Sequence, residues 1–260
     1  MQDLTDHHRL SAAVVLYHSG VEMLPCIQSF VDSDVYLDLY VVNNSPGDAS
    51  FFSANWNCPG MHYLAADKNL GYGAGNNLVL PKLRSTYHVI CNPDVTFAPD
   101  TLRRMMEAME ESGATILTPR VLNPDGTEQF LPRRTPTVRR LISRRMPKSS
   151  RYWQKIQQEY TLEGLDVNQR MNVEYATGCF MMVRTRVLAQ QLHGFDPRFF
   201  LYHEDSDLSR RVLKNGGTIL YTPDIAITHT WKRDSAHHLK GILRHIRSTI
   251  QYFNKWGWTW

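Results

Sequence analysis

Short β-rich runs alternate with helical segments along the first 120 residues, and this alternation restricts the fold more than any other feature of the chain. The β-rich runs cover residues 11–17, 36–43, 61–65, 87–92 and 114–119. Helical patterns fill the intervals at 21–30, 71–83 and 99–112. Strand, helix and strand at this spacing predict an α/β fold, in which a mostly parallel, Rossmann-like central sheet is flanked by helices.

Beyond residue 120 the pattern changes. Asp125-Gly126 predicts a hairpin turn, and the proline-broken stretch from Leu131 to Lys155 predicts loop mixed with short helix. Further elements are expected at 173–183 (strand), 184–192 (helix), 204–215 (helix), 218–221 (strand) and 226–229 (strand), before a basic C-terminal helix. We expect one domain over residues 1–260, made of a sheet half (1–120), a hairpin and basic insertion (121–172), a second half (173–235) and an amphipathic helix and tail (236–260).

The chain has 29 Lys and Arg against 25 Asp and Glu, and these charges are unevenly distributed. Nine basic residues and no acidic one lie between Leu131 and Lys155, so the rest has 20 basic and 25 acidic residues. A length of 260 residues with 42% apolar content is enough for a large core, which excludes a mainly disordered protein.

Targeting signals and cysteine spacing are also informative. The longest apolar runs, such as 12–17 and 35–42, are far shorter than the roughly 18 to 20 residues of a spanning helix. The opening MQDLTDHHRL lacks the apolar stretch of a signal peptide, so we expect a cytoplasmic protein. Cys26, Cys58, Cys91 and Cys179 form no CxxC pair, which favours free buried thiols over a zinc site or a disulfide framework.

Small polar residues follow each of the first four predicted strands. They are Tyr17-His18-Ser19, Asn43-Asn44-Ser45, Asp67-Lys68-Asn69 and Asn92-Pro93-Asp94. Each group alone is an ordinary turn sequence. Because ligands in such sheets bind at the carboxyl ends of the strands, four polar ends on one edge indicate a ligand pocket.

Two segments carry candidate chemistry. Asp94 follows Pro93 at a strand end, where its carboxylate either caps the next turn or holds Mg²⁺ or Mn²⁺ together with a diphosphate. His203, Glu204, Asp205 and Asp207 open a predicted helix directly after the aromatic run Phe199, Phe200 and Tyr202. The helix dipole alone explains carboxylates there, whereas an apolar wall can also raise a carboxyl pKa toward that of a general base.

Two further signals leave alternatives open. His229 ends a predicted strand; it is either structural or forms a mixed oxygen and nitrogen site with Asp94, which would favour Mn²⁺. The GYGAG segment at 71–75 fits a dinucleotide fingerprint poorly because it follows the third strand. Its glycines allow either close helix packing or close approach to a phosphate.

Together these segments resemble the inverting GT-A glycosyltransferases of family 2, especially the rhamnosyltransferase-like branch of bacterial surface polysaccharide and lipopolysaccharide synthesis. The resemblance covers nearly the whole chain. It rests on AVVLYHS, VVNNS, DKNLGYGAGNN, CNPDV, LNPDGT with a following RRTP, ATGCFMMVR, GFDPRFFLYHEDSDLSRR and a late His.

The resemblance implies transfer of a sugar from a nucleotide diphosphate to an acceptor hydroxyl, with inversion. Asp205 would be the general base, Asp94 the last acid of the metal-binding DxD motif, and His229 a further metal ligand. Residues implied to contact the donor or its nucleotide are Tyr17, Asn43, Asn44, Asp67, Asn69, Gly71, Gly75, Asn76, Asn92 and Asp94. Residues implied to face the acceptor are His203, Glu204, Trp231, Arg133 and Arg134.

Two positions depart from the family pattern. Asn92 replaces the first acid of DxD, which weakens the expected metal site, and Asn43 replaces the usual Asp after the second strand, which can alter donor preference. The resemblance favours thymidine diphosphate rhamnose as donor, with a uridine diphosphate hexose or hexosamine as the alternative. The implied acceptor is a glycan, lipid-linked in our expectation.

The same sequence suggests two other functional classes. The basic stretch and a pI near 8.9 suggest a nucleic-acid binder, but the interleaved aromatics of such proteins are missing, so we expect no nucleic-acid partner. Asn43 and Asn92 are compatible with a non-catalytic sugar-nucleotide binder.

Two basic segments each have two possible roles. The stretch 131–155 either holds an anionic lipid-linked acceptor or the membrane surface, or is a solvated loop. The C-terminal aromatics Tyr252, Phe253, Trp256, Trp258 and Trp260 either bind the inner face of a membrane peripherally or pack on protein.

Overall fold

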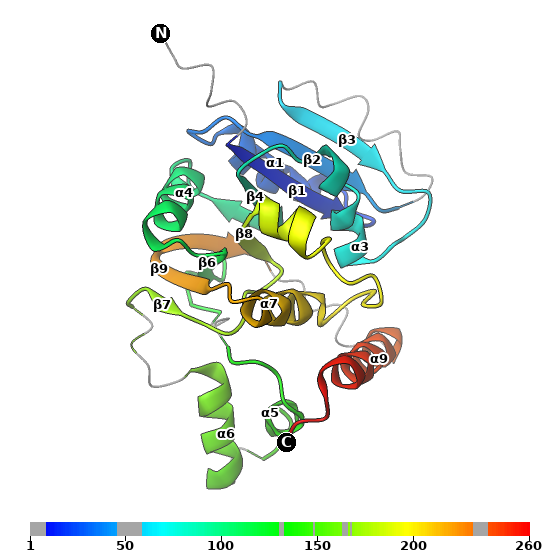
Figure 1. The fold of residues 1–260 in the computed structure, drawn as a ribbon, viewed down its shortest axis with the longest axis vertical. Helices are drawn as coiled ribbons and strands as arrows, with labels where there is room; N and C mark the ends of the chain where they lie inside the picture. The colour runs from blue at the N-terminus through cyan, green and yellow to red at the C-terminus, as the bar shows by residue number, and fades with distance from the viewer. Residues whose placement is uncertain are drawn as a thin grey trace.

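The computed structural model describes residues 9–45, 59–129, 133–147, 149–162, 166, 168–230 and 239–260. Nine strands within these residues form one sheet in the order β3-β2-β1-β4-β8-β6-β9-β5, with β7 paired to β9 (Figure 1). The strands are β1 Leu10–Leu16, β2 Asp38–Asn43, β3 Met61–Ala65, β4 Tyr87–Cys91, β5 Val95–Phe97, β6 Ile116–Leu122, β7 Met171–Asn172, β8 Phe180–Arg184 and β9 Ile219–His229.

The first four strands of this order pair in parallel, as do β6 and β9, while β8, β5 and β7 pair antiparallel with their neighbours. The helices are α1 Leu24–Val31, α3 Tyr72–Asn77, α4 Thr101–Ser112, α5 Val138–Ser143, α6 Arg151–Thr161, α7 Glu204–Lys214 and α9 Leu239–Trp256. Short 3-10 turns lie at Val21–Met23 and Leu80–Lys82, and a π-helical segment at Arg186–Gln191. The predicted α/β class with a mostly parallel sheet is confirmed.

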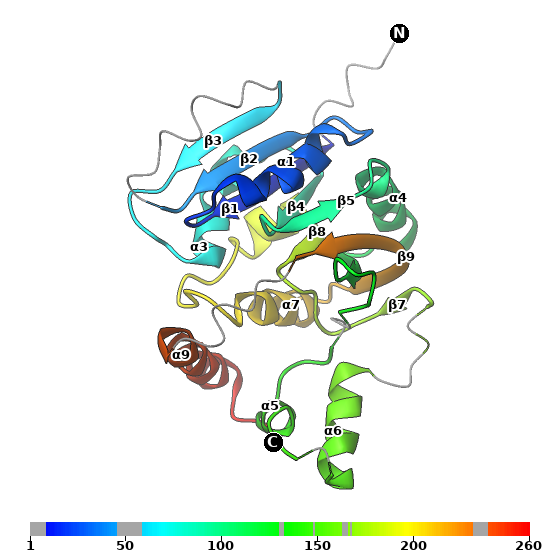
Figure 2. The same ribbon diagram turned by 180° about the vertical axis from the view of Figure 1, so that it is seen from behind.

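Strand β1 shows why the sheet is covered on both faces. All seven of its residues are buried, and alternate residues point to opposite faces because the side-chain period of a strand is two. Leu10, Ala12, Val14 and Leu16 join the core beneath α1 and α4, whereas Ala13 and Val15 pack with Val79 and Leu83 next to α3. Figure 1 shows α3 in front of the sheet, and Figure 2 shows α1 in front after the half turn.

Several predicted boundaries need correction. The strand expected at 173–183 is β8 preceded by a loop, because the loop donates backbone N–H groups from Ala176 and Gly178 to side chains of α7 rather than to a neighbouring strand. The two strands expected at 218–221 and 226–229 are one strand, β9, with an irregular register opposite Pro119 and Arg120. The helix expected at 71–83 is α3 followed by a 3-10 turn, and β5 was missed.

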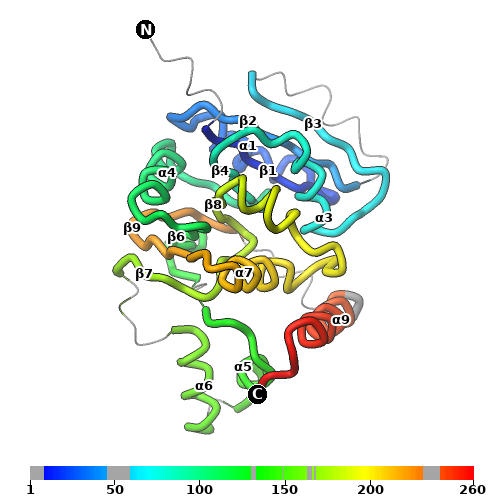
Figure 3. Tube along the Cα trace, in the orientation of Figure 1, coloured from blue at the N-terminus to red at the C-terminus, as the bar shows by residue number. Residues whose placement is uncertain are grey.

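Three helices gather at one end of the molecule, beyond α7 and away from β3. The tube in Figure 3 leaves the sheet after β6, forms α5 and α6, and returns at β7. Both ribbon views place α9 and the C-terminus beside α5. The backbone N–H of Val138 on α5 donates to the carbonyl of Thr259 at 2.9 Å. No helix among the described residues is long and apolar enough to cross a membrane.

Cys26, Cys91 and Cys179 are buried and form no disulfide, and Cys58 lies outside the described residues. The thiols of Cys26 and Cys91 lie 3.8 Å apart in the core. These three cysteines therefore act as small apolar core residues, which agrees with the prediction from their spacing.

Candidate functional site

Asp205 lies in the first turn of α7, and its carboxylate is held from two sides. Its Oδ2 accepts hydrogen bonds from the Tyr175 hydroxyl at 2.5 Å and from the Gly178 backbone N–H at 3.1 Å. Its Oδ1 accepts one from the backbone N–H of Ser206 at 2.7 Å. The side chain remains partly exposed, in contrast to Asp207 in the same turn, which is fully buried. Asp205 is therefore an oriented carboxylate that solvent and a ligand can reach.

The short segment Gly178–Cys179 joins this carboxylate to the turn between β4 and β5, which contains Asp94. Gly178 donates to Asp205, and the Cys179 carbonyl accepts the backbone N–H of Asn92 at 2.8 Å. Burial, with smaller contributions from the charges of Asp94 and Asp205, raises the pKa of the Cys179 thiol to about 12. The two carboxylates thus flank one segment, although 110 residues separate them in the sequence.

Asp94 and His229 face each other across the start of β5 and the end of β9. His229 Nε2 lies 3.2 Å from Asp94 Oδ1, and both atoms are buried without a hydrogen-bond partner among the described residues. On the other side of the ring, His229 Nδ1 lies 3.1 Å from Gln129 Oε1, while Gln129 Nε2 donates to the His229 carbonyl. Because an amide oxygen accepts, Nδ1 carries the proton in the neutral ring.

That tautomer directs the lone pair of His229 Nε2 at a carboxylate oxygen. Two facing acceptors repel each other unless a proton or a cation lies between them. An oxygen and an imidazole nitrogen are suitable ligands for Mn²⁺, so this pair fits the divalent cation that the sequence predicts. No third His, Cys, Asp or Glu joins them to form a metal cluster within the described residues, so further ligands would have to be oxygens of a bound molecule or water.

The polar strand ends meet at one edge, but some of their side chains are already engaged. Asn44 donates to the Gly71 carbonyl at 3.1 Å and accepts from the Leu70 N–H at 2.9 Å. Asn43 donates to the Tyr63 hydroxyl and accepts from the Ser45 N–H. Asn44 therefore holds the loop before α3, and its predicted contact with a nucleotide stays a prediction.

Other predicted donor residues are less constrained. Tyr17 is 48% exposed, and Asp67 is exposed, at the ends of β1 and β3. Asn69 accepts from the Gly71 N–H, and Asn92 is half-buried. The buried Asn76 amide donates to the Tyr72 carbonyl, but its Oδ1 has no partner among the described residues.

The glycines of 71–75 are needed for close packing. A Cβ on Gly71 would lie 2.0 Å from the Phe200 carbonyl oxygen, and its φ of 86° is in the left-handed region. A Cβ on Gly73 or Gly75 would lie 2.9 Å from Phe195 or Val15. Of the two interpretations left open, the structure supports packing, while phosphate contact by Gly71 and Gly75 stays a prediction.

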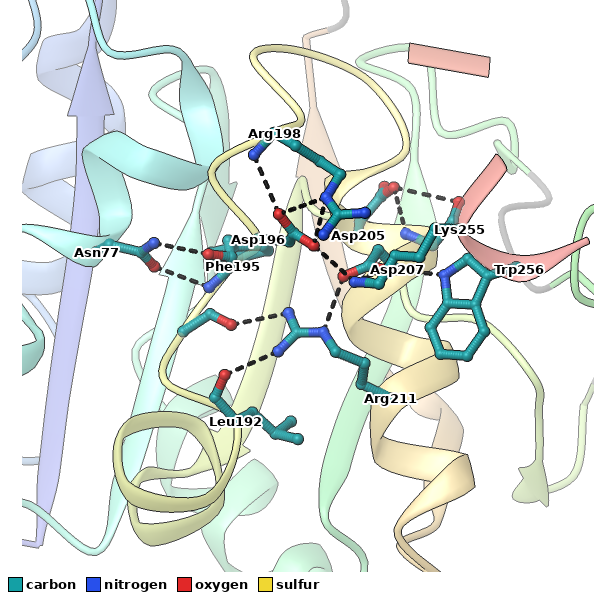
Figure 4. A network of polar contacts seen from close by, with 12 residues as sticks. Asn77, Leu192, Phe195, Asp196, Arg198, Asp205, Asp207, Arg211, Lys255 and Trp256 are labelled. Carbon is teal, nitrogen blue, oxygen red and sulfur yellow. Dashed lines mark hydrogen bonds and ion pairs between the residues drawn. The ribbon is translucent and has the colours of Figure 1, made fainter. Parts of the chain in front are cut away.

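A buried polar network fixes the loop before α7 in place (Figure 4). Asn77 of α3 exchanges two hydrogen bonds of 2.8 Å with the Phe195 backbone. Asp207 accepts from Arg211 at 2.8 Å, from Trp256 Nε1 at 2.8 Å and from Lys255 at 2.6 Å, and Lys255 also contacts Asp196. The network joins α3, α7 and α9, so Asp207 is a structural carboxylate that holds α7 in position.

His203 and Glu204, predicted to face the acceptor, are both buried. His203 Nε2 lies 3.0 Å from the Thr249 hydroxyl, and its ring stacks on Tyr252 of α9. Burial lowers the pKa of His203 to about 3. Burial, with a smaller contribution from the neighbouring charge of Asp205, raises the pKa of Glu204 to about 8. Both side chains are thus neutral near pH 7, and their acceptor roles stay predictions.

The remaining acceptor candidates lie near Tyr175 or outside the described residues. Arg133 forms an isolated β-bridge with Tyr175, and its guanidinium lies 5.9 Å from the ring centre of Tyr160. Arg134 forms an ion pair with Glu174 at 3.3 Å. Trp231 lies outside the described residues.

Sequence reasoning missed two residues of this site. Tyr175, which donates to Asp205, stands three residues before Gly178 in a segment interpreted as a strand. Gln129, which orients His229, follows the predicted hairpin turn. Neither residue has a local signal, because their partners are 30 and 100 residues away.

Comparisons with known proteins identify the family of the chain. A family model described as "Glycosyl transferase family 2" matches residues 11–192. The chain is 26% identical over 234 residues to the N-acetylglucosaminyl-diphospho-decaprenol L-rhamnosyltransferase of Mycobacterium tuberculosis, covering 82% of this chain and 73% of that protein.

Solved structures share the fold. S. aureus TarS 1–349 in complex with UDP-GlcNAc matches 86% of this chain and 59% of its own, with a TM-score of 0.58 and 16% identity. The match to the mannosyltransferase PcManGT from Pyrobaculum calidifontis, in complex with GDP-Man and Mn²⁺, covers 94% of this chain and 64% of that chain, with a TM-score of 0.59 and 13% identity. The chain thus spans less than two thirds of either solved chain. The family match over most of the chain confirms the resemblance seen in its motifs, and the protein belongs to glycosyl transferase family 2.

Proposed function

We propose that the protein transfers a sugar from a nucleoside diphosphate sugar to an acceptor hydroxyl, with inversion at the anomeric carbon. The observation that carries this proposal is the placement of Asp205 and Asp94 on either side of Gly178–Cys179. A base on one side, and on the other a carboxylate that would hold the cation of the leaving diphosphate, is the arrangement that a single displacement needs. Membership of family 2 and neighbours solved with UDP-GlcNAc or GDP-Man support it.

Asp205 is the general base in this proposal. The Tyr175 hydroxyl and the Gly178 N–H hold one carboxylate oxygen, so the rotamer is fixed before the acceptor binds. A carboxylate has about four acceptor positions, which leaves room for an acceptor hydroxyl. As the acceptor oxygen attacks the anomeric carbon, Asp205 takes its proton, and the bond to the nucleoside diphosphate breaks.

Asp94 and His229 would hold a divalent cation, Mn²⁺ or Mg²⁺. The support in this chain is that Asp94 Oδ1 and His229 Nε2 are buried 3.2 Å apart with no other partner among the described residues. When bound, such a cation neutralises negative charge on the leaving diphosphate. Asn92, two residues before Asp94, has a neutral amide in place of a carboxylate, so we expect weaker metal affinity than for a site with two acids.

For the donor, we propose thymidine diphosphate rhamnose. The relative named as a rhamnosyltransferase supports this choice, and the TarS complex with UDP-GlcNAc supports the alternative of a uridine diphosphate hexosamine. A thermal-shift screen of both donors with Mn²⁺ decides between them, because only the ligand of the native state raises the melting temperature.

We further propose that the acceptor is a lipid-linked glycan of cell-surface polysaccharide synthesis and that the protein acts at the cytoplasmic face of a membrane. The name of the mycobacterial relative includes a diphospho-decaprenol acceptor. In this chain, Arg133 lies beside Tyr175, the partner of Asp205, and its Nε is buried without a hydrogen-bond partner among the described residues. A cation at that place suits the diphosphate of an acceptor whose sugar reaches the base.

The test of the base is Asp205→Asn. We expect turnover to fall by about 100-fold or more, since general bases contribute 10² to 10⁴, while donor affinity measured by calorimetry stays within about twofold. Asp166→Asn changes an exposed carboxylate and serves as the control. If Asp205→Asn keeps wild-type turnover, Asp205 is not the base; if the wild type binds donor but transfers no sugar to any acceptor, the protein is a binder.

The metal is tested separately. Calorimetric titration of Mn²⁺ into the protein with nucleoside diphosphate should show binding that His229→Gln and Asp94→Asn each weaken at least tenfold. Equal turnover in EDTA and in Mn²⁺ would remove the cation from the proposal.

A further inference from the structure

Helix α9 has one face packed on the protein and one face bare. Tyr252 and Phe253 are buried with Phe199, against Val138 and Leu141 of α5. Beside this packed face, α9 carries four exposed apolar side chains, which we call the apolar face of α9: Ile242 (37% exposed), Leu243 (57%), Ile246 (44%) and Ile250 (44%). Their spacing of three and four residues places them in one stripe along the helix.

A cavity of about 500 Å³ opens between α9 and the loop at 197–201. Arg198, Arg244 and Arg247 line it together with Phe200 and Leu201. The guanidinium of Arg244 lies 5.3 Å from the centre of the Phe200 ring. Arg198 pairs with Asp196, whereas no ion pair with a carboxylate is found for Arg244 or Arg247 within the described residues. The cavity therefore combines an apolar wall with uncompensated positive charge.

Positive charge predominates at the end of the molecule that holds α5, α6 and α9, although Glu159 lies near the end of α6. Residues 235–260 contain four basic and no acidic side chains, and residues 129–158 contain nine basic and no acidic ones. Figures 1 and 2 show that α5, α6 and α9 lie at the same end. Exposed apolar residues next to one-sided positive charge are the properties of a surface that binds anionic lipid.

We propose that this end docks on an anionic phospholipid surface, with the apolar face of α9 in the interfacial layer and a lipid phosphate held in the cavity by Arg244 and Arg247. The charge favours lipid over a second copy of the chain, because a symmetric contact through α9 would bring the same arginines of two copies together. The stripe is also too short for a spanning helix, so the helix lies in the membrane plane.

Such docking places the candidate base near the membrane. Thr249 of α9 contacts His203, which is two residues from Asp205. An acceptor carried on lipid would then reach the base without leaving the membrane surface. Only the delivery of the acceptor to Asp205 rests on the proposed function. Binding of α9 to lipid does not require sugar transfer.

The test is flotation of the full chain with phosphatidylcholine vesicles, with and without phosphatidylglycerol. We expect binding only to the anionic vesicles. A triple variant, Leu243→Ser with Ile246→Ser and Ile250→Ser, should weaken vesicle binding at least tenfold, because it removes the apolar side chains that enter the interfacial layer. A double variant, Arg244→Gln with Arg247→Gln, should also weaken it at least tenfold, because each basic residue contributes several-fold at an anionic surface. Arg103→Gln with Arg104→Gln, on α4 at the sheet, is the charge-matched control and should bind like wild type.

Melting temperature and turnover on a water-soluble acceptor are measured for every variant. We expect the serine and glutamine variants of α9 to keep the wild-type melting temperature and turnover, since all five substituted side chains are exposed. Loss of flotation in variants that keep both values supports the inference. Flotation that the two variants do not change would overturn it. A wild-type dimer in sedimentation that the triple serine variant converts to monomer, without vesicle binding, would also overturn it and assign the face to a second copy. Vesicle binding by a wild type without transferase activity would refute the proposed function and leave the docking intact.

Discussion

Glu204 provides a direct test of the electrostatics beside the candidate base. Its carboxyl group is 6% exposed, and its Oε2 has no hydrogen-bond partner among the described residues. Burial and the adjacent Asp205 raise its pKa from 4.5 to about 8. The native state therefore keeps the proton of Glu204 at neutral pH, whereas the unfolded chain releases it above pH 4.5.

The sign and size of the effect follow from proton linkage. Between pH 4.5 and 8 the native state binds one more proton at this site than the unfolded state, so the site lowers the free energy of unfolding as pH rises. Each pH unit is worth about 1.4 kcal/mol, which gives about 5 kcal/mol across the whole window. Gln has the shape of the protonated acid but releases no proton, so Glu204→Gln removes this loss.

The assay is urea unfolding of wild type and Glu204→Gln between pH 4.5 and 9. The two should be equally stable at pH 4.5, and the variant should gain stability over wild type up to about pH 8, with no further change above. His203, whose pKa is lowered to about 3, cancels in the difference because both proteins contain it. A variant that is less stable than wild type at pH 8 would show that Glu204 is ionised and paired, and would refute the reasoning.

Two further predictions concern stability. Asp207→Asn should lower the free energy of unfolding, measured in urea, by about 3 kcal/mol, because it leaves Arg211 and Lys255 with an uncharged partner in a buried site. The control is Glu107→Gln, which changes an exposed ion pair and should alter the free energy of unfolding by less than about 1 kcal/mol. Equal losses in the two variants would contradict the argument. Gly71→Ala should lower the melting temperature well beyond Gly113→Ala, since both have positive φ but only at Gly71 does the new methyl meet backbone, 2.0 Å from the Phe200 oxygen. Similar melting temperatures for the two alanine variants would mean that the Phe200 segment moves aside freely.

Local patterns were sufficient for most of the fold. The largely apolar runs of β1 and β4 are typical of strands buried on both faces, and Gly113 marks the end of α4 in the left-handed conformation. Prediction failed at 173–179, where the residues are compatible with a strand but their N–H groups bond to α7. It also missed β5, because three residues are too few for a recognisable pattern.

The candidate site divides in the same way. The polar strand ends and the carboxylates at the start of α7 are features of adjacent residues, so the sequence by itself places them at one edge of the sheet. Apart from the family resemblance, which assigns the base to Asp205, the local pattern does not separate Asp205 from Asp207. Two positions along a helix rotate a side chain by roughly 200°, but which face meets solvent depends on packing. Lys255 and Trp256, about fifty residues further on, enclose Asp207 and leave Asp205 open beside Tyr175. Only the tertiary structure brings these partners together, because their contacts lie between residues that no local pattern connects.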